Sequence, residues 1–299
     1  MKPVKFFSLA RITFCLFIVC VLFSCKKPRK VTIIPPVVID TPGLIPNYEH
    51  VVILILENKP SERIIGSASA PFINSLVLRS AFFTESYAIE HPSQPNYLDL
   101  YSGSNQGVTN NATPAQSFTT GNLGSQLISK NKTFVTFSEN LPSVGWNGYS
   151  SNGYARKHNP AANWMGTGSN QVPITTNQPF TSFPSNYKDL PAVSYVIPTI
   201  YHDMHDGTIE EGDTWVKENL SDFITWASIN NSLFILTFDE DDGSYNNHIT
   251  TLFIGQKVKI GSYSEKITHY TVLRTLEDMF NLPYAGAAAK EASIIKCWE

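Results

Sequence analysis

The sequence predicts an α/β protein, a three-layer sandwich in which helices cover both faces of a largely parallel central sheet. Two observations carry this prediction. Short unbroken aliphatic runs, typical of strands buried on both faces, recur along the chain, and segments with apolar residues at helical spacing lie between them. Such alternation is typical of the α/β class. The 299 residues would suffice for one large domain or two ordinary ones. The amino-acid composition does not change to a second type after Tyr48, so we expect one domain over residues 48–299.

Five segments are predicted to be buried strands. The clearest begins at Val51 and runs without a polar residue to Leu56. The others cover residues 133–137, 193–197, 233–238 and 251–254. Their β-branched and aliphatic side chains suit a pleated surface that is covered on both sides.

Two amphipathic helices are predicted in the C-terminal half. The first covers about residues 213–229, with one face formed by Trp215, Leu220, Phe223, Ile224 and Ala227. The second lies near the C-terminus, with one face formed by Val272, Leu273, Leu276, Met279 and Phe280. By contrast, residues 140–185 are rich in Asn, Gly, Ser and Pro and show little periodicity. Loops of this length in compact domains tend to form binding or active sites.

Residues 1–24 have the layout of a secretory signal peptide, with three basic residues, an apolar stretch and no acidic residue. The motif Leu22-Phe23-Ser24-Cys25 resembles the lipobox of bacterial lipoproteins, which implies that Cys25 is lipidated. The alternative is an uncleaved membrane anchor, but the apolar run is shorter than the roughly 20 residues that a spanning helix needs. Residues 25–47 contain five prolines and are predicted to be an extended tether that follows the lipidated cysteine.

A lipid-anchored protein of this kind would lie in the cell envelope of a bacterium, at the periplasmic face or the outer membrane. Two of the four cysteines would leave with the signal peptide, so that Cys25 carries the lipid and Cys297 remains as a free thiol. Loss of residues 1–24 leaves 19 basic against 25 acidic residues, a balance of −6. Without a basic excess, charge-driven binding of nucleic acid is not expected.

Acidic residues directly follow two of the predicted strands. Glu57 and Asn58 come after the strand that ends at Leu56, and Asp239 and Glu240 follow the strand over residues 233–238. The carboxyl ends of parallel strands meet at one edge of a sheet, and packed carboxylates attract a divalent cation. The alternative is two ordinary acidic turns. A calcium EF-hand loop starting at Asp239 is excluded, because its glycine and its bidentate glutamate would be misplaced.

Ser93 lies in the segment His91-Pro92-Ser93-Gln94-Pro95-Asn96-Tyr97. Pro95 suits the first turn of a helix, which places Ser93 just ahead of the helix N-terminus. Unpaired backbone amides and the helix dipole favour an anion there. A serine at this position could be a nucleophile if a metal or base lowers its hydroxyl pKa. The alternative is an ordinary capping serine.

A second cluster of polar residues follows the strand over residues 193–197. It contains two histidines and two carboxylates in five residues, His202-Asp203-Met204-His205-Asp206. Such a set suits metal ligation, because carboxylates also orient histidine ligands. His248 could complete the same site, and His158, in the loop over residues 140–185, could supply positive charge to a substrate anion.

With these segments in order, the chain resembles the bacterial phosphoesterase family that includes acid phosphatases and phospholipases C, within the alkaline phosphatase superfamily. The resemblance extends from Tyr48 to Pro283. The matching motifs are residues 51–58, 91–97, 202–206, 238–241 and His269-Tyr270. It implies an alkaline phosphatase-like fold. Sulfatases share a similar nucleophile turn but place an arginine where this chain has Tyr97, so a sulfatase is disfavoured.

The resemblance also implies roles for individual residues. Ser93 is similar to a nucleophile that forms a phosphoseryl intermediate, and Asn96 matches an asparagine that steadies the phosphoryl oxygens. The implied ligands of the metal that activates Ser93 are Glu57, Asn58, Ser93 itself, Asp239 and Glu240. Asp203, His205 and His248 match positions that hold a second metal or contact phosphate. One or two divalent ions are therefore implied, with Zn, Mg, Mn and Ca all open.

These observations predict a metal-dependent phosphoric ester hydrolase, an acid phosphatase-like phosphomonoesterase that acts through a phosphoserine. Further candidates bind the phosphoryl oxygens (His91, His158, Lys157) or protonate the leaving group (His202, His205). A phosphodiesterase or a phospholipase C on the same core stays open, although the short chain favours small soluble esters. The rivals outside this chemistry are a catalytically dead scaffold and a surface lipoprotein that binds glycans through loop aromatics. Those aromatics, Trp146, Tyr149, Tyr154 and Trp164, suit loop packing equally well.

Overall fold

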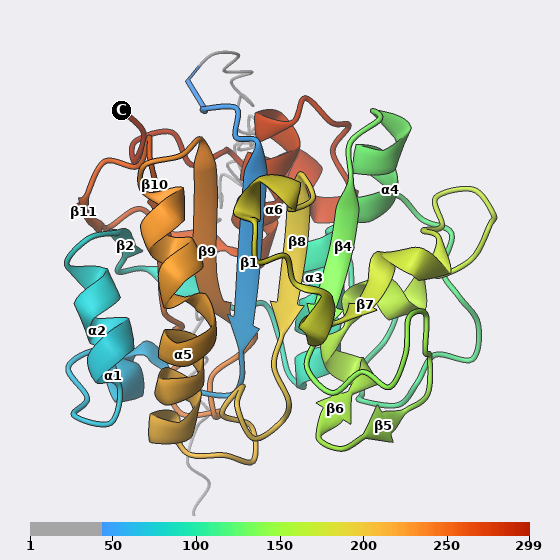
Figure 1. Cartoon of the computed structure of the whole chain (residues 1–299), viewed down its shortest axis with the longest axis horizontal. Coiled ribbons are helices and arrows are strands. Elements are labelled where there is room, and N and C mark those ends of the chain that lie inside the picture. Colours follow the sequence, from blue (N-terminus) through green and yellow to red (C-terminus); the bar gives the residue numbers. More distant parts are fainter. Residues whose placement is uncertain (1–43) are drawn as a thin grey trace, which may run out of the picture. The chain divides into compact units, whose positions relative to one another are not determined.

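The computed structural model describes residues 44–299 and confirms a mixed α/β fold around a large, mostly parallel sheet. The sheet has eight strands in the order β11-β2-β10-β9-β1-β8-β4-β7 (Figure 1). A parallel block is formed by β9 (Ser232–Phe238), β1 (His50–Leu56), β8 (Val193–Ile197), β4 (Phe134–Ser138) and β7 (Asn177–Pro179). At one edge, β10 (Thr251–Gly255) runs antiparallel to β9 and to β2 (Ala81–Phe83), which pairs in parallel with β11 (Gly261–Tyr263).

Strand β1 lies at the centre of the parallel block and contributes to both cores. Val51, Ile53 and Ile55 belong to the core on one face of the sheet. The intervening side chains, from Val52 to Leu56, belong to the core on the other face. Burying each such side chain contributes about 1.5–3 kcal/mol. The unbroken aliphatic run in the sequence is therefore explained by two covered faces.

Helices cover both faces of the sheet (Figure 1). One core contains side chains of α1 (Ser61–Ile64), α2 (Pro71–Val77) and α5 (Ile209–Ala227). The other core contains side chains of α3 (Ser93–Ser102), α4 (Leu123–Ser129) and α6 (His269–Met279). Helix α5 begins four residues before the predicted start because Thr208 and Glu211 form a capping box there.

The five predicted strands are confirmed, each within one residue at either end. The direction of β10 was not predictable from its apolar run, since a buried strand reads alike in either orientation. Strands β2, β7 and β11 are too short for a periodic signal, as are the pairs β3 (Ser86–Tyr87) with β12 (Ile267–Thr268) and β5 (Ser150–Ser151) with β6 (Tyr154–Ala155).

The long loop after β4 is built from short turns that are fixed by side chains. Arg156 donates to Asn147, to Asn163 and to the carbonyl oxygen of Ala162. This network fixes the 3-10 turn Arg156–His158, which lies beside α3. The fully buried ring of Tyr154 packs on Trp146 within the loop, and the fully buried ring of Trp164 packs on Tyr101 and Phe118. Tyr154 and Trp164 are not available to a glycan, which favours the loop-packing interpretation for these two aromatics.

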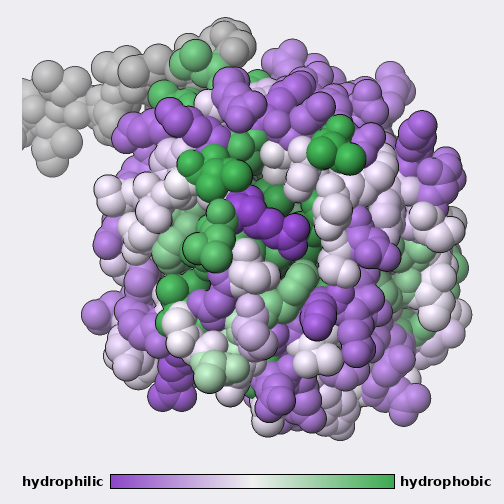
Figure 2. Space-filling view, turned by 60° about the vertical axis from the view of Figure 1, so that its left-hand side comes forward, coloured by the Kyte–Doolittle hydropathy of each residue, from purple (hydrophilic) through white to green (hydrophobic). Residues whose placement is uncertain are grey.

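The edge of the sheet that carries β11 is seen in Figure 2, where hydrophobic side chains gather around a hollow in a mainly hydrophilic face. A groove of about 430 Å³ on this side is lined in part by Arg79, Ile229, Val258 and Ile260. It lies near the amino end of β9, because Ile229 is three residues before that strand. Glu57 and Asp239, at the carboxyl ends of β1 and β9, lie at the opposite end of the sheet.

The predicted signal peptide, Cys25 and the tether up to residue 43 lie outside the described residues. Within residues 44–299, none of the helices has the length and apolar character that a membrane span requires. In the same part of the chain, Cys297 is a buried free thiol, as predicted, and burial raises its pKa.

Candidate active site

The acidic residues after β1 and β9 lie side by side at the carboxyl edge of the sheet. The register pairs Leu56 with Phe238, so Glu57 and Asp239 follow at the same level. The amide of Asp239 donates to the carbonyl oxygen of Leu56 at 2.9 Å, which extends the pairing by one residue. Glu57, Asp239 and Glu240 are all buried. The structure therefore brings together three of the acidic residues that the strand-end argument selected.

Ser93 is the first residue of α3, and its hydroxyl lies between two of these carboxylates. Its Oγ is 3.0 Å from Glu57 Oε2 and 3.0 Å from Glu240 Oε1. A hydroxyl has one proton and can donate to only one carboxylate at a time. Helix α3 begins after Pro92, which supplies no side-chain cap. The amide of Gln94 donates to Asn111 Oδ1 at 3.0 Å and Pro95 has no N–H, so among the first three residues of the helix the Ser93 amide is the one left for a ligand.

The three carboxylates concentrate negative charge in a buried space. Burial, together with the charges of Glu57 and Glu240, holds the pKa of Asp239 well above its usual range. Burial also raises the pKa of Glu240, although His91 and Ser93 act in the opposite direction. Asp239 Oδ1 accepts from the amide of Asn58 at 3.0 Å, while Oδ2 is buried without a hydrogen-bond partner. A buried, incompletely paired set of hard oxygen donors is what a divalent cation binds.

His158 supplies a buried positive charge directly beside this cluster. Its Nε2 forms an ion pair with Glu57 Oε1 and its Nδ1 with Asp203 Oδ2, both at 2.9 Å. Burial alone would lower the pKa of His158, but the carboxylates of Glu57 and Asp203 raise it to about 9. Burial would raise the pKa of Glu57, but His158 lowers it to about 2. His158 is therefore a cation at neutral pH.

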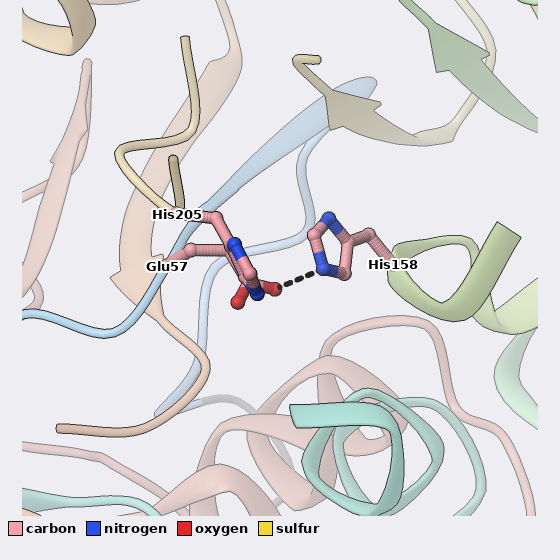
Figure 3. A group of neighbouring side chains, drawn as sticks. All are labelled: Glu57, His158 and His205. Atoms are coloured by element: carbon pink, nitrogen blue, oxygen red, sulfur yellow. Dashed lines mark ion pairs between the residues drawn. The ribbon is translucent and has the colours of Figure 1, made fainter. Parts of the chain in front are cut away.

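His205 joins Glu57 and His158 in a compact group (Figure 3). One ligand-type atom from each of the three residues lies within 4.8 Å of the others, which is spacing that a metal could use. Both ring nitrogens of His158, however, face carboxylates, and a protonated imidazole has no lone pair for a metal. His205 Nε2 lies 2.9 Å from Lys157 Nζ. The group is thus better suited to bind an anion than a second cation.

His91 lies at the more exposed side of the cluster. Its Nδ1 pairs with Glu240 Oε2, and its Nε2 lies 3.4 Å from Asp241 Oδ1. Its side chain is 46% exposed, so it can reach both solvent and the buried carboxylates. His91 was predicted to bind phosphoryl oxygens, and that role stays a prediction.

Asn96 is engaged with the backbone that precedes Ser93. Its Oδ1 accepts from the amides of Ile89 and Glu90, and its Nδ2 donates to the carbonyl oxygen of Glu90. These bonds fix the turn that carries the nucleophile candidate. They leave one Nδ2 hydrogen, and contact of Asn96 with a phosphoryl group stays a prediction.

His202 lies apart from the cluster. Its Nδ1 is 2.9 Å from Glu139, and its ring stacks on Trp215. Among the contacts of residues 44–299, none joins His202 to Ser93 or Glu57. The reason is local: His202 and His205 come before and after a sharp turn, so their side chains leave the segment in different directions.

His248 also has other partners. Its Nδ1 is 2.7 Å from Glu62 Oε1 and its Nε2 is 2.9 Å from the carbonyl oxygen of Thr84. In the described part of the chain it makes no contact with Asp203 or His205, so the expected grouping of these three residues is not observed. Asp203 and His205 instead converge on His158 and Glu57.

Two further side chains support the cluster and were not assigned roles from the sequence. Tyr97 stacks on His158 with ring centroids 5.3 Å apart and an interplanar angle of 11°. His269, at the start of α6, donates from Nε2 to the carbonyl oxygen of Asp239 at 2.7 Å. Burial lowers the pKa of His269 to about 4, so the ring is neutral. Both residues belong to motifs of the family resemblance, but no chemical pattern in the sequence predicts their contacts with His158 and Asp239.

Comparisons with known proteins agree with this geometry. The model of the Phosphoesterase family matches residues 67–283. A phosphatidylinositol-3-phosphatase of Mycobacterium tuberculosis is 44% identical over 292 residues, which cover 97% of this chain and 96% of that protein. An acid phosphatase of Aspergillus fumigatus is 30% identical over 240 residues, which cover 74% of this chain and 53% of that protein. The chain thus spans about half the length of that fungal relative.

Solved structures show the same fold at low sequence identity. A protein of the alkaline phosphatase superfamily from Vibrio parahaemolyticus aligns with a TM-score of 0.56 and 14% identity, over 81% of this chain and 68% of that one. A phosphonate monoester hydrolase from Silicibacter pomeroyi aligns with a TM-score of 0.53 and 10% identity, over 82% and 76%. The chain has the fold of the alkaline phosphatase superfamily, belongs to the phosphoesterase family, and is a hydrolase of phosphoric ester bonds.

Proposed function

We propose that the protein is a metal-dependent phosphomonoesterase in which Ser93 is the nucleophile. The observation that carries this proposal is the position of the Ser93 hydroxyl, 3.0 Å from both Glu57 and Glu240 at the N-terminus of α3. Either carboxylate can accept the hydroxyl proton as the oxygen attacks phosphorus. The Ser93 amide and the positive end of the α3 dipole would then stabilise a phosphoryl oxygen.

The residues at this edge fit a divalent metal. Glu57, Asp239 and Glu240 would hold it, with the Asn58 side chain as a further oxygen ligand. The support is the raised pKa of Asp239 together with its unpartnered buried Oδ2, since both indicate negative charge that lacks a counter-ion. When bound, such an ion lowers the pKa of a nearby hydroxyl and offsets phosphoryl charge.

The group around His158 has a different task in this proposal. The His158 cation and the Lys157–His205 pair provide positive charge on the far side of Glu57 from Ser93. Lys157 would bind a remaining phosphoryl oxygen, and the Lys157–His205 pair would carry the proton that the leaving group needs. His158, whose two ring nitrogens both pair with carboxylates, would act through its charge. His205 replaces His202 as the better-placed donor, because His202 is bonded to Glu139. Water would then attack the phosphoserine and restore Ser93.

The relatives favour phosphate monoesters as substrates. The names acid phosphatase and phosphatidylinositol-3-phosphatase both describe removal of a terminal phosphate. A monoester carries up to two negative charges, which fits a site that combines a metal with His158 and Lys157. We therefore rank monoester cleavage above phosphodiesterase and phospholipase C activity, with a phosphorylated lipid headgroup as the second candidate substrate because of the 44% identical relative.

We further propose that the protein is anchored to a bacterial cell envelope through lipid on Cys25. The support is the lipobox-like text at residues 22–25 and the proline-rich segment that follows. Cells expressing the full chain should carry the protein in the membrane fraction, labelled by radioactive palmitate. Cys25→Ser should abolish the label, and a label that persists in this variant would contradict lipidation at Cys25.

The activity is tested with p-nitrophenyl phosphate as the monoester and bis(p-nitrophenyl) phosphate as the diester. We expect faster release from the monoester, loss of turnover on chelation, and recovery on addition of a divalent ion. Ser93→Ala should reduce kcat by about a thousandfold or more, whereas the control Ser75→Ala, on the exposed side of α2, should not change it. Turnover that survives both chelation and Ser93→Ala would refute the proposal.

A further inference from the structure

Met204 adopts a backbone conformation that a methionine rarely takes. Its φ is 79°, in the left-handed region, and its side chain is fully buried. The other non-glycine residues with positive φ in residues 44–299 are asparagines and one glutamine. A left-handed backbone costs free energy in a residue without a short polar side chain, so the surrounding structure must hold it. Such outliers cluster at functional sites.

The turn at Met204 directs two site residues toward the same place. Asp203, before it, forms the ion pair with His158. His205, after it, lies beside Glu57 and His158. The amide of His205 also donates back to Asp203 Oδ1 at 2.8 Å, which closes the turn. A regular extended segment would leave residues i and i+2 about 7 Å apart along the strand, whereas the bond between the His205 amide and the Asp203 carboxylate folds these two residues into a turn.

Lys59 holds the backbone of the turn through a hydrogen bond. Its Nζ donates to the carbonyl oxygen of Met204 at 2.7 Å. A second donor from the same segment, the amide of Glu57, donates to the carbonyl oxygen of Asp203 at 2.7 Å. Two consecutive carbonyls of this turn are therefore tied to the segment that follows β1. The side chain of Lys59 is half-buried at this position.

The side chain of Met204 is held by the start of α5. A Cβ atom built on Gly212 would lie 2.5 Å from Met204 Cγ and 2.7 Å from its Cε. The absence of a side chain at Gly212 thus makes room for Met204 in the core. This space accommodates the Met204 side chain, whereas the backbone of the turn is held at its carbonyl by Lys59.

We propose that Lys59 is a positioning residue for phosphoester hydrolysis: by holding the carbonyl of Met204, it maintains the turn that aims Asp203 and His205 at the reacting centre. Lys59 itself does not contact substrate in this scheme. The inference deepens the proposed function, because it rests on the role given there to His158 and His205.

The test begins with Lys59→Met, which keeps the length of the side chain and removes the donor. We expect kcat for p-nitrophenyl phosphate to fall by about tenfold to a hundredfold, as small displacements of catalytic groups do, with unchanged far-UV circular dichroism. Lys59→Arg, which retains a donor, should keep kcat within about threefold. Arg63→Met is the matched control for charge, since Arg63 also lies near Lys59 but pairs with Asp242. It should leave kcat within about twofold.

A second substitution separates positioning from stability. Glycine takes a left-handed φ without strain, so Met204→Gly in the Lys59→Met background should recover at least half of the lost factor in kcat. The same substitution removes a buried side chain and should lower Tm. A role of Lys59 in stability alone predicts that the double variant is worse in both measurements.

Three results would overturn the proposal: normal kcat in Lys59→Met, an equal loss in Arg63→Met, or a double variant that is less active than Lys59→Met. Ser93→Ala is assayed in parallel. If Ser93→Ala keeps its activity, the nucleophile assignment fails, while the Lys59 series still reports whether the turn positions the groups that cleave the ester.

Discussion

Replacing Glu240 by glutamine should stabilise the metal-free protein and at the same time remove its activity. Glu57 Oε2 and Glu240 Oε1 each lie 3.0 Å from Ser93 Oγ. The two carboxylate oxygens are therefore at most about 6 Å apart, and at an effective dielectric constant of about 20 their repulsion is about 3 kcal/mol or more when both are ionised. Without a cation, this repulsion opposes folding.

The glutamine also loses a favourable contact. Glu240 pairs with His91, whose side chain is 46% exposed, so this pair contributes about 0–1 kcal/mol. The net gain in the free energy of unfolding should be about 2 kcal/mol for the chelated protein. For a domain of this size, that gain corresponds to a rise in Tm of about 4–8 °C.

The assay is thermal unfolding followed by circular dichroism, first with chelator and then in a titration with a divalent ion. Wild type should gain more stability from the ion than Glu240→Gln, and kcat of the variant should fall by about a hundredfold or more. Glu218→Gln, an exposed position on α5, is the matched control and should change neither quantity. A chelated Glu240→Gln that is less stable than wild type, with turnover intact, would refute the reasoning.

Two further substitutions test buried charges. His158→Gln leaves Glu57 and Asp203 without their shared cation and should destabilise the protein by about 3–5 kcal/mol at pH 6. Because the pKa of His158 is raised from 6.5 to about 9, its contribution is complete below pH 6.5 and disappears as pH rises through 9. Urea unfolding of wild type and variant across this range should therefore converge, and a constant difference would contradict the ion-pair role. Burial raises the pKa of Glu277 from 4.5 to about 8, so wild type loses stability between these values, by up to about 5 kcal/mol. Glu277→Gln should remove that loss and raise Tm at pH 8.5, and an unchanged or lower Tm there would be the contrary result.

The strands and the acidic rim were predictable because each depends on a local pattern with one physical cause. A strand covered on both faces requires a continuous aliphatic run, and β1 and β9 both show it. Neighbouring parallel strands end at one edge of a sheet, so the sequence alone predicts that Glu57 lies near Asp239. Ser93 followed from Pro95 in the first turn of its helix.

The histidines were less predictable because their positions depend on backbone geometry and on distant partners. Nothing in the sequence shows that Met204 takes a left-handed φ, which separates His205 from His202. The pairing of His158 with Glu57 joins residues that are far apart in the chain, and it depends on the loop that Arg156 fixes.

Closeness in sequence was misleading for His248. It follows the acidic segment after β9 by only a few residues, which suggested a shared site. In the structure, the carboxylate of Asp241 accepts from the amides of Gly243, Tyr245 and Asn247 and forms a compact loop. That loop brings His248 to Glu62 on α1 instead of to Glu57 at the carboxyl edge of the sheet.

Acid quenching of the reaction within its first turnovers, followed by peptide mass spectrometry, tests the central claim most directly. Wild-type protein given p-nitrophenyl phosphate should yield a phosphoryl group on the peptide that contains Ser93. The same peptide from Ser93→Ala should be unmodified, and that variant should be inactive. Continued turnover by wild type with no phosphorylated peptide, together with an active Ser93→Ala, would contradict the account.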